Sequence, residues 1–540
     1  MAVAAVVCAV VLAPVASLLL IAVSGTGADW PHLAENVLPG ATRTTLALLS
    51  MVAAAAVTIG VTSAWLVVTF EFPGRRTFAW ALVLPLAVPP YLAAYAMAEF
   101  LHFSGPAQGA LRWMFGFASP RDYWFPDVRS TPGAALVLGA VLYPYVYLTT
   151  RVVFLMQGRN IADVARTLGA GPARVLFTVL LPVARPAIVA GTVLVLMETV
   201  NDIGASEYLG VRTLTFSVFT TWLNRGSLEG AAQIAMLMLV LIVALVAAEE
   251  WARRRQRFHA ARATQIKAQP PRVALAGWRA GLATVAVAAP VIVGFGVPIY
   301  VFIRYSLRRL EMFASAELAE ALVNSIVTAT ATALLTVGIG LLLIHAARLS
   351  RNGAAFVMAR AAAFGYALPG TILGLGLLFF LARVDNLVDG LARSAFGLST
   401  GLILTGSLAA VVLACSIRFL ALAQGAIRSG LEKLPPHLDE AARSLGHGPT
   451  ESAVRVVLPL LKPAILTAGV LVFVDTVKEL SATILLRPFG FNTLATSVYE
   501  DASRAVLEDT GPAALLIILT AVVPVLLLSR ALARDEPATL

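Results

Sequence analysis

Two apolar stretches of the sequence each carry acidic residues that are four positions apart. METVNDIGASEYLG contains Glu198 and Asp202. VDTVKELSATILLRPFG contains Asp475, Lys478 and Glu479. Residues at this spacing share one face of a helix, and a charge at mid-bilayer costs about 2.5–3.5 kcal/mol, so it usually faces water or a partner. We predict that these side chains line a polar path. Because carboxylate oxygens suit hard cations, Asp202 and Glu479 are expected to make transient cation contacts. The alternative is structural, with Lys478 neutralising a neighbouring acid or the acids lying at an outer mouth.

The composition limits which kind of protein can hold these charges. Of the 540 residues, 59% are hydrophobic and 13% are charged, whereas a soluble domain has roughly 45–50% apolar and about 25% charged residues. This argues against a soluble globular enzyme and excludes a disordered chain. The two cysteines, Cys8 and Cys415, exclude a disulfide framework and a zinc site. The six histidines show no metal-ligand spacing, so we expect no fixed metal and no enzyme.

The apolar segments are long enough to cross a membrane. A helix needs about 20 apolar residues to cross a bilayer core, and twelve stretches meet this length. They are 2–24, 44–70, 80–102, 134–156, 186–206, 232–250, 276–303, 321–347, 355–381, 400–422, 463–485 and 512–530. We therefore predict an all-α polytopic membrane protein with about 12 transmembrane helices.

The basic residues assign an orientation to these spans. With the N-terminus inside, 25 of the 40 Lys and Arg residues fall in inner segments and about 12 in outer loops, as expected for cytoplasmic enrichment. The net charge of +10 thus reflects membrane topology, and no nucleic-acid partner is expected. We predict cytoplasmic N- and C-termini. We also expect residues 1–24 to be a retained span, because no Lys or Arg precedes the apolar run as in a signal peptide.

The sequence repeats itself with an offset of 277 residues. Ile161–Ile188 reads IADVARTLGAGPARVLFTVLLPVARPAI, and Leu438–Ile465 reads LDEAARSLGHGPTESAVRVVLPLLKPAI. The two acidic pairs share this offset. Six predicted spans precede the basic run between the copies, and six follow it, so we predict two parallel six-helix repeats. The predicted parts are a first half, 1–250, with a loop at 151–186, a cytoplasmic basic linker, 251–275, and a second half, 276–540, with a loop at 423–463.

Each copy of the repeat predicts a short amphipathic helix followed by a turn. The repeated turn residues are Gly169 and Gly446, Pro172 and Pro449, and Pro182 and Pro459. Apolar residues recur at i, i+3, i+4 and i+7 before the glycines, which suit the C′ position of a helix. The first prolines suit the start of the next helix, and the second prolines interrupt it. A helix of about 12 Å is marginal alone. This helix could pack on the lipid surface or on the spans of its own chain. It could also dock a cytosolic partner, and the presence of two equally spaced copies favours docking.

These loops resemble the cytoplasmic motif of ABC importer permeases: Glu-Ala-Ala, three residues, Gly, nine residues, a branched apolar residue, one residue and Leu-Pro. The second copy matches this motif, and the first has Asp for Glu and Val for Ala. The resemblance implies that each loop forms a coupling helix that inserts into a groove of an ATPase subunit, where Asp163 and Glu440 pair with a basic residue. The coupling residues that it implies are Asp163, Val164, Ala165, Gly169, Pro182, Glu440, Ala441, Ala442, Gly446 and Pro459.

The sequence contains no G-x-x-x-x-G-K-[ST] stretch, so it cannot cradle ATP phosphates in the P-loop manner. We expect this chain to bind no cofactor, with ATP and Mg²⁺ held by two copies of a separate ATPase.

Four segments resemble the fused two-half permeases of ferric-iron importers. They are LPLAVPPY at 84–91, METVNDIGASEYLGVRTLT at 197–215, TTWLNRG at 220–226 and VKELSATILLRPFGFNTLATSVYE at 477–500. The resemblance implies a type I ABC importer permease in a bacterial inner membrane, and a periplasmic or surface-tethered binding protein that delivers ferric iron.

Other transporters remain as alternatives. Permeases for thiamine, polyamines or phosphonates share the loop and the layout. An ion-driven secondary transporter would also have twelve spans, and FPGRR at 72–76 faintly resembles the basic loop of that superfamily. However, it lacks the usual acidic residue, and the two long repeated loops have no place in that fold.

Proline predicts a further feature that the halves share. LPLAVPPYLAAYA contains Pro89 and Pro90 in the third span, and YALPGTILG contains Pro369 and Gly370 in the ninth. We expect broken helices at these matching places, either beside a transport path or as plain kinks.

Overall fold

The computed structural model describes residues 2–24, 27–157, 169, 171–254, 272–349, 353–432, 434, 444 and 448–534. Within these residues the chain is almost entirely helical and forms two compact units. Unit 1 comprises Met1–Leu33, Val218–Leu239 and Glu311–Asp501. Unit 2 comprises Ala34–Ser217, Val240–Leu310 and Ala502–Leu540.

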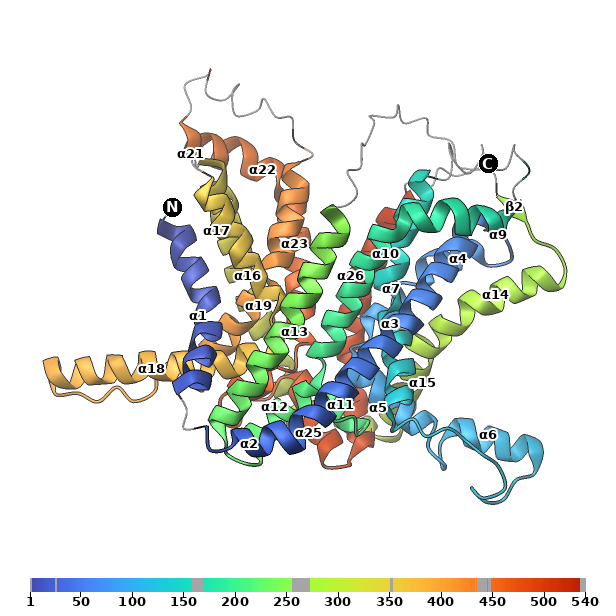
Figure 1. Ribbon diagram of the computed structural model, residues 1–540, viewed down its shortest axis with the longest axis horizontal. Coiled ribbons are helices and arrows are strands. Elements are labelled where there is room, and N and C mark those ends of the chain that lie inside the picture. The colour runs from blue at the N-terminus through green and yellow to red at the C-terminus, as the bar shows by residue number, and fades with distance from the viewer. Residues whose placement is uncertain are drawn as a thin grey trace. The chain divides into compact units, whose positions relative to one another are not determined.

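Unit 1 contains the first helix of the chain and most helices of the second half (Figure 1). Its elements are α1 (Ala2–Ser24), α2 (Trp30–His32), η5 (Leu310–Ala314), α16 (Ala316–Leu349), α17 (Ala354–Ala362), η6 (Ala363–Ala367), α18 (Gly370–Phe396), α19 (Leu408–Leu431), α21 (Pro449–Ser452), η7 (Ala453–Val457), α22 (Leu458–Leu460), α23 (Lys462–Val477), α24 (Thr483–Leu486) and α25 (Leu494–Ser503). The unit boundaries at Val218 and Leu239 fall inside α12 (Leu214–Leu223) and α13 (Leu228–Arg254), and those at Glu311 and Asp501 fall inside η5 and α25.

Unit 2 contains most helices of the first half and the last helix of the chain. Its elements are η1 (Leu33–Val37), α3 (Leu38–Thr69), β1 (Phe70–Glu71), α4 (Arg75–Ala81), η2 (Leu84–Ala87), α5 (Pro90–Phe100), α6 (Pro106–Phe115), α7 (Thr131–Gln157), α9 (Pro172–Val175), η3 (Leu176–Leu180), α10 (Leu181–Asn201), α11 (Ile203–Tyr208), β2 (Val273–Ala274), α14 (Trp278–Val291), η4 (Ile292–Gly296), α15 (Val297–Arg308), η8 (Leu507–Asp509) and α26 (Thr510–Arg534). The two strands pair in parallel, with Phe70 opposite Val273.

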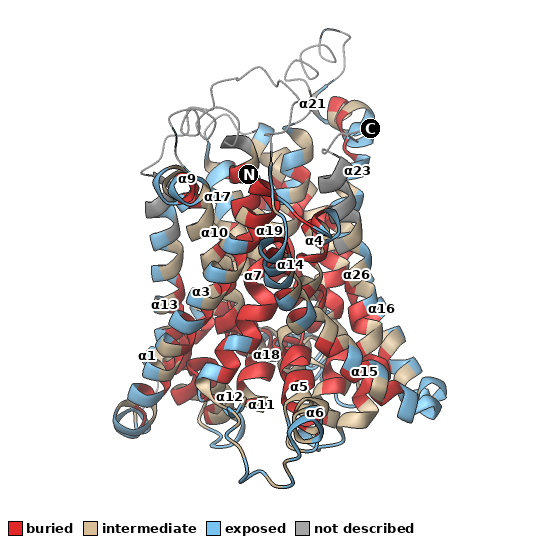
Figure 2. Ribbon diagram, turned by 90° about the vertical axis from the view of Figure 1, so that its right-hand side faces the viewer, coloured by how far each residue is buried: buried red, intermediate tan, exposed pale blue. Residues whose placement is uncertain are grey.

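The helices confirm the predicted all-α polytopic fold. In the described part of the chain, 10 helices are long and apolar enough to cross a membrane, and two bent helix pairs raise this number to as many as 12. Large apolar side chains lie exposed on the outward faces of these helices, including Leu334 at 72% and Val240 at 65% (Figure 2). Such side chains need an apolar surrounding, which a bilayer supplies.

Proline breaks the third span of each half in the same way. Pro89 precedes α5 with φ −55° and ψ 141°, and Pro369 precedes α18 with φ −56° and ψ 142°. A 3₁₀ turn precedes each break, and Val88 and Leu368 are extended, as residues before proline tend to be. In the first half the two parts of the span are bent by 98°. The predicted breaks are confirmed.

The compact units do not coincide with the halves of the sequence. The first predicted span, α1, belongs to unit 1, where it packs on α17 and α18 of the second half. Conversely, α15 and α26 belong to unit 2, where α15 packs on α5 of the first half and on α26. The division into 1–250 and 276–540 describes the sequence repeat and stays a prediction, while the packing joins segments of both halves in each unit.

Candidate functional site

Asp202 lies at the point where the fifth predicted span breaks. Helix α10 ends at Asn201, and Asp202 leaves the helical conformation with φ −82° and ψ 108°. Its carboxylate accepts a hydrogen bond of 2.6 Å from the backbone N–H of Ala205, while the Ser206 hydroxyl donates to its backbone oxygen at 3.0 Å. Asp202 is therefore the N-cap of α11, a position at which an acid satisfies otherwise unpaired N–H groups.

Glu479 occupies the same place in the second half and is held more tightly. Its Oε1 accepts from the Ala482 N–H at 2.9 Å and pairs with Nη1 of Arg418 at 2.9 Å. Its Oε2 accepts from the N–H and the hydroxyl of Thr483, at 3.0 and 2.6 Å. The Glu479 side chain is 1% exposed, so this carboxylate is buried with both oxygens bonded.

The two turns are equivalent under the sequence repeat. The capped residues, Ala205 and Ala482, have the same 277-residue offset as Asp202 and Glu479. We call these two sites the acid-capped turns. They differ in the acid itself and in its surroundings, because Arg418 on α19 corresponds to Val141 on α7.

The break of the ninth span lies against the second acid-capped turn. A Cβ on Gly370 would come within 2.7 Å of the Ser481 Cβ and 2.9 Å of Nη1 of Arg418. Only glycine leaves room for α18 to begin so close to this turn. The proline break and the acid-capped turn thus form one packed junction within unit 1.

The remaining predicted path residues are placed as follows. Asp475 pairs with Lys478, Oδ1 to Nζ, at 2.7 Å, and both side chains are 26% exposed. This is the structural alternative considered from the sequence, in which Lys478 neutralises a neighbouring acid. Glu198 lies one turn before Asp202 and accepts the Asp202 N–H at its backbone oxygen, at 3.1 Å. Among the described residues, no group of three or more His, Cys, Asp or Glu could hold a metal ion.

A second matched contact joins the first residue of the helix that follows each acid-capped turn region, α12 or α25, to the long second span of its half. The N–H of Leu214 donates to the Thr45 hydroxyl at 2.9 Å, and the N–H of Leu494 donates to the Ser325 hydroxyl at 2.8 Å. All four residues are buried. We call these contacts the hydroxyl clamps. Sequence reasoning missed them, although both halves carry Thr-Leu at this point, as Thr213-Leu214 and Thr493-Leu494.

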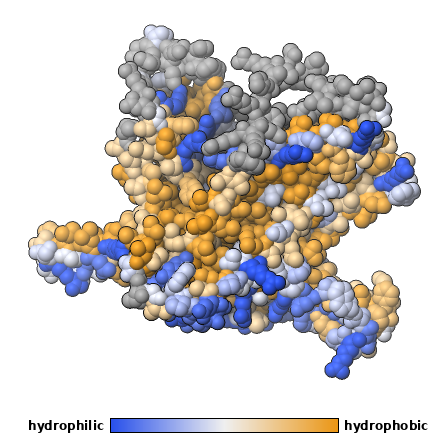
Figure 3. All heavy atoms as spheres, in the orientation of Figure 1, coloured by the Kyte–Doolittle hydropathy of each residue, from blue (hydrophilic) through white to orange (hydrophobic). Residues whose placement is uncertain are grey.

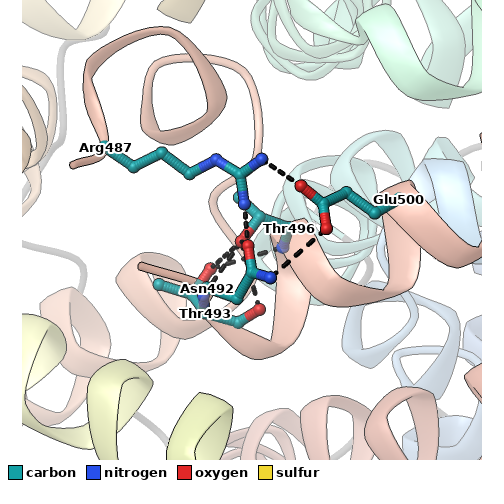
Figure 4. Close-up of polar contacts among 5 residues, drawn as sticks. All are labelled: Arg487, Asn492, Thr493, Thr496 and Glu500. Carbon is teal, nitrogen blue, oxygen red and sulfur yellow. Dashed lines mark hydrogen bonds and ion pairs between the residues drawn. The ribbon is translucent and has the colours of Figure 1, made fainter. Parts of the chain in front are cut away.

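The second half carries an extra polar cluster beyond its turn. Figure 4 shows Arg487 reaching both Asn492 and Glu500, and the Asn492 amide donates to Glu500 at 3.3 Å. The Asn324 amide also donates to the Asn492 backbone oxygen at 3.0 Å. These contacts tie down the two ends of the loop whose tip is Phe489, a fully exposed side chain.

The predicted coupling segments lie only partly within the described residues. Gly169 has φ +82°, the left-handed conformation expected of a C′ glycine. Pro172 and Pro449 begin α9 and α21, which confirms their predicted place at a helix start. The predicted coupling residues outside the described part of the chain are Asp163, Val164, Ala165, Glu440, Ala441, Ala442 and Gly446.

Pro182 and Pro459 follow a five-residue π-helical turn in both halves. This turn covers Leu176–Leu180 in the first half and Ala453–Val457 in the second. A proline cannot donate the regular helical hydrogen bond and its ring crowds the preceding turn, which accounts for a wider turn just before it. In the second half the helix also bends by 72° between Leu460 and Lys462. The predicted interruption is thus confirmed in the second half, whereas in the first half the helix continues through Pro182 from Pro172 to Asn201 with only the π-helical turn.

The family model for binding-protein-dependent transport system inner membrane components matches residues 56–258 and 355–535. Each range contains one acid-capped turn. The chain belongs to this family. With two copies of the domain in one polypeptide, the permease is of the fused two-half ABC importer type and is a multi-pass inner membrane protein.

Three relatives show what the permease resembles. Fe(3+)-transport system permease protein FbpB 2 of Haemophilus influenzae is 24% identical over 505 residues, covering 93% of the permease and 90% of the relative. Molybdenum transport system permease protein ModB of Escherichia coli is 29% identical over 212 residues, covering 38% of the permease and 88% of the relative. A Salmonella paratyphi A relative, PhnU, named for 2-aminoethylphosphonate transport, is 28% identical over 210 residues, covering 38% and 71%. These names describe transport permeases rather than enzymes.

Proposed function

We propose that the permease carries ferric iron across the inner membrane after a binding protein delivers it. The observation that carries this proposal is the extent of similarity. The relative named for Fe(3+) transport aligns with 93% of the permease, through both halves, whereas the relatives named for molybdenum and 2-aminoethylphosphonate each align with 38%. The four segments that resemble ferric-iron permeases include both acid-capped turns.

We propose that the acid-capped turns line the path of the ion. A trivalent cation needs negative charge or oxygen ligands along an apolar crossing, and Glu198, Asp202, Asp475 and Glu479 supply carboxylates at matched places in both halves. Asp202 pairs with a backbone N–H, whereas Glu479 is neutralised by Arg418. A cation contact at Glu479 therefore requires the Arg418 pair to open.

The energy for transport would come from outside the chain. We propose that two copies of an ATPase dock on the loops 151–186 and 423–463 from the cytoplasm, where the N- and C-termini also lie. ATP and Mg²⁺ belong to those subunits. The binding protein would approach from the periplasmic side, near the loop tip at Phe489.

The substrate assignment can be tested by reconstitution. The permease, its ATPase and its binding protein are placed in proteoliposomes, and ATP-dependent uptake of radiolabelled ferric iron is compared with that of molybdate, thiamine and 2-aminoethylphosphonate. We expect uptake of iron alone. Uptake of another solute in place of iron would assign the permease to that solute, and uptake driven by an ion gradient without ATP would favour a secondary transporter.

A variant of the same preparation tests the docking role. Gly169→Pro removes a left-handed glycine turn, and Gly446→Pro changes the matching residue of the second copy. The double variant should release the ATPase in a pull-down and abolish uptake. Gly116→Pro is the matched control, because Gly116 also has a positive φ and open space around it, outside the repeated loops. Retained ATPase binding in the double variant would contradict docking at these loops.

A further inference from the structure

Helix α18 has two parts with different surroundings. From Gly370 to Leu381 it is mostly buried in unit 1, and Gly376 crosses α1 so closely that a Cβ there would come within 2.5 Å of the Pro14 backbone oxygen. From Asn386 to Phe396 most of its residues are exposed. Figure 1 shows this part extending away from the other helices of unit 1, across the direction of α1 and α16. We call residues 382–407 the α18 arm.

The return loop of the arm is fixed to one face of α18. Asp385 accepts hydrogen bonds from the backbone N–H groups of Leu404 and Thr405, at 3.0 and 2.8 Å. Asp389 accepts from the Ser399 hydroxyl and from the Thr400 and Gly401 N–H groups, at 2.9, 2.7 and 3.1 Å. Arg393 pairs with Asp389 at 2.7 Å. The arm is therefore a defined hairpin, with its polar groups directed toward the return loop.

The opposite face of the arm is apolar and uncovered. Leu387, Val388 and Leu391 are 65%, 39% and 60% exposed, and they recur at helical spacing. Figures 1 and 3 have the same orientation, and α1 extends upward from the arm in Figure 1. In Figure 3 the upper edge of the arm is hydrophobic and its lower edge is hydrophilic. The apolar face thus points along the length of the spans, and the polar face points away from them.

The exposed part is too short to cross a bilayer. The 11 residues from Asn386 to Phe396 span about 16 Å at 1.5 Å per residue, whereas the hydrocarbon core is about 30 Å thick. A helix that lies in the plane of the interface instead buries one apolar face by about 5–10 Å and keeps charges on the other. The α18 arm has this distribution, although the apolar composition of α18 as a whole qualifies it as a span.

We propose that the α18 arm lies in the lipid interface of the bilayer, with Leu387 and Leu391 among the acyl chains and the Asp389–Arg393 pair toward the water. Under the proposed orientation this is the periplasmic leaflet. A lipid surface fits better than a protein partner, because the apolar face is turned toward the side on which the spans are themselves lipid-exposed. A binding protein approaching from the water would meet the polar face.

The arm would fix the depth of the broken ninth span. Because α18 is continuous from Gly370 to Phe396, anchoring its far end in the interface sets the position of its first residues. Those residues pack against Arg418 and Ser481 at the second acid-capped turn. The inference therefore links lipid contact at the surface to the junction inside the unit, and it does not depend on which solute is carried.

Spin labels test the placement of the arm. In a background with Cys8→Ser and Cys415→Ala, a nitroxide is attached at Leu391→Cys on the apolar face or at Asn386→Cys, an exposed residue on the other side of the helix. In liposomes we expect the Leu391 label to collide more with oxygen, which concentrates in acyl chains, than with a water-soluble nickel chelate. The Asn386 label should show the reverse. In each case ATPase binding checks that the variant is assembled.

Two outcomes would overturn the proposal. If both labels collide mainly with the nickel chelate in liposomes, the arm lies in water. If the Leu391 label is reached by the chelate and is shielded only when the binding protein is added, the apolar face is a protein-binding surface instead. A label at Leu387→Cys repeats the measurement at a second apolar position, so that one poorly folded variant does not decide the result.

Discussion

The two acid-capped turns share one contact, in which the acid accepts the backbone N–H three residues further on, and differ in what else the acid binds. In the first half, Asp202 caps α11 through the Ala205 N–H, and the residue equivalent to Arg418 is Val141. In the second half, Glu479 caps the same turn, also bonds Thr483, and forms a buried ion pair with Arg418. The capping contact is thus the shared element, and the pair with Arg418 is particular to the second half.

The difference shows how to interpret matched acids in an apolar repeat. An acid that ends one helix and begins another has a structural reason to be present, since it satisfies N–H groups that no water reaches. Matched positions alone therefore do not demonstrate contact with an ion. They identify two turns at which the backbone leaves the helix, which is also where an apolar span can expose polar groups to a path.

The largest effect is expected from Arg418→Val, which copies the first-half residue into the second half. It leaves the Glu479 carboxylate buried without its cation, and breaking a buried pair in this way costs about 3–5 kcal/mol. Thermal unfolding in lipid nanodiscs measures the loss. Adding Glu479→Gln should recover most of it, because no buried charge then remains.

Helix α19 offers a matched control for this variant. Arg428 pairs with Glu432 at 3.0 Å, but both side chains are more than half exposed, and an exposed pair is worth about 0–1 kcal/mol. Arg428→Val should therefore change stability little. If both arginine variants lose the same stability, burial of the Glu479 pair is not what distinguishes the halves.

A smaller and symmetric effect is expected from the hydroxyl clamps. Thr45→Val and Ser325→Ala each leave a buried N–H without its acceptor, which costs about 1–3 kcal/mol. Because the two contacts are equivalent, the two losses measured by unfolding should agree closely. Thr467→Val serves as the control, since the Thr467 hydroxyl is exposed and bonds only within its own helix. A large loss in one half and none in the other would show that the clamps are not a shared element.

The smallest change in stability is expected at Asp202, where Ala and Asn variants separate the capping role of the side chain from its negative charge. Asn is as good an N-cap as Asp, while Ala cannot cap and costs about 0.5–2 kcal/mol. Asp202→Ala should therefore lower stability, and Asp202→Asn should leave it nearly unchanged while slowing iron uptake if the charge serves the ion. Equal stability of the two variants would rule out a capping role, and normal uptake by the Asn variant would remove the proposed cation contact.

Local signals in the sequence predict much of this fold. Span length and apolar composition predict the helices, Pro89 and Pro369 predict the two breaks, and Pro172 and Pro449 predict two helix starts. Each of these features depends on residues close together in the chain. The 277-residue offset then predicts that the turn at Asp202 has a counterpart at Glu479.

Long-range contacts could not be predicted in this way. Arg418 lies within the predicted span 400–422, and the structure buries it in α19 against Glu479, 61 residues further on. The hydroxyl clamps join residues 169 positions apart. A hydroxyl inside a span commonly bonds its own helix, as Thr45 also does with the Ala41 oxygen at 2.8 Å, so its sequence context gives no sign of a distant partner.

The segments of the two compact units alternate along the sequence, and this limits where the polypeptide could be cut into two fragments. The polypeptide passes between the units five times, at residues 33, 217, 239, 310 and 501. Cutting it in the basic linker would therefore yield two fragments, neither of which holds all the segments of either unit. The two fragments would have to associate in the membrane before either unit could complete its packing. A single polypeptide that contains both halves avoids this association step, which separate subunits must make.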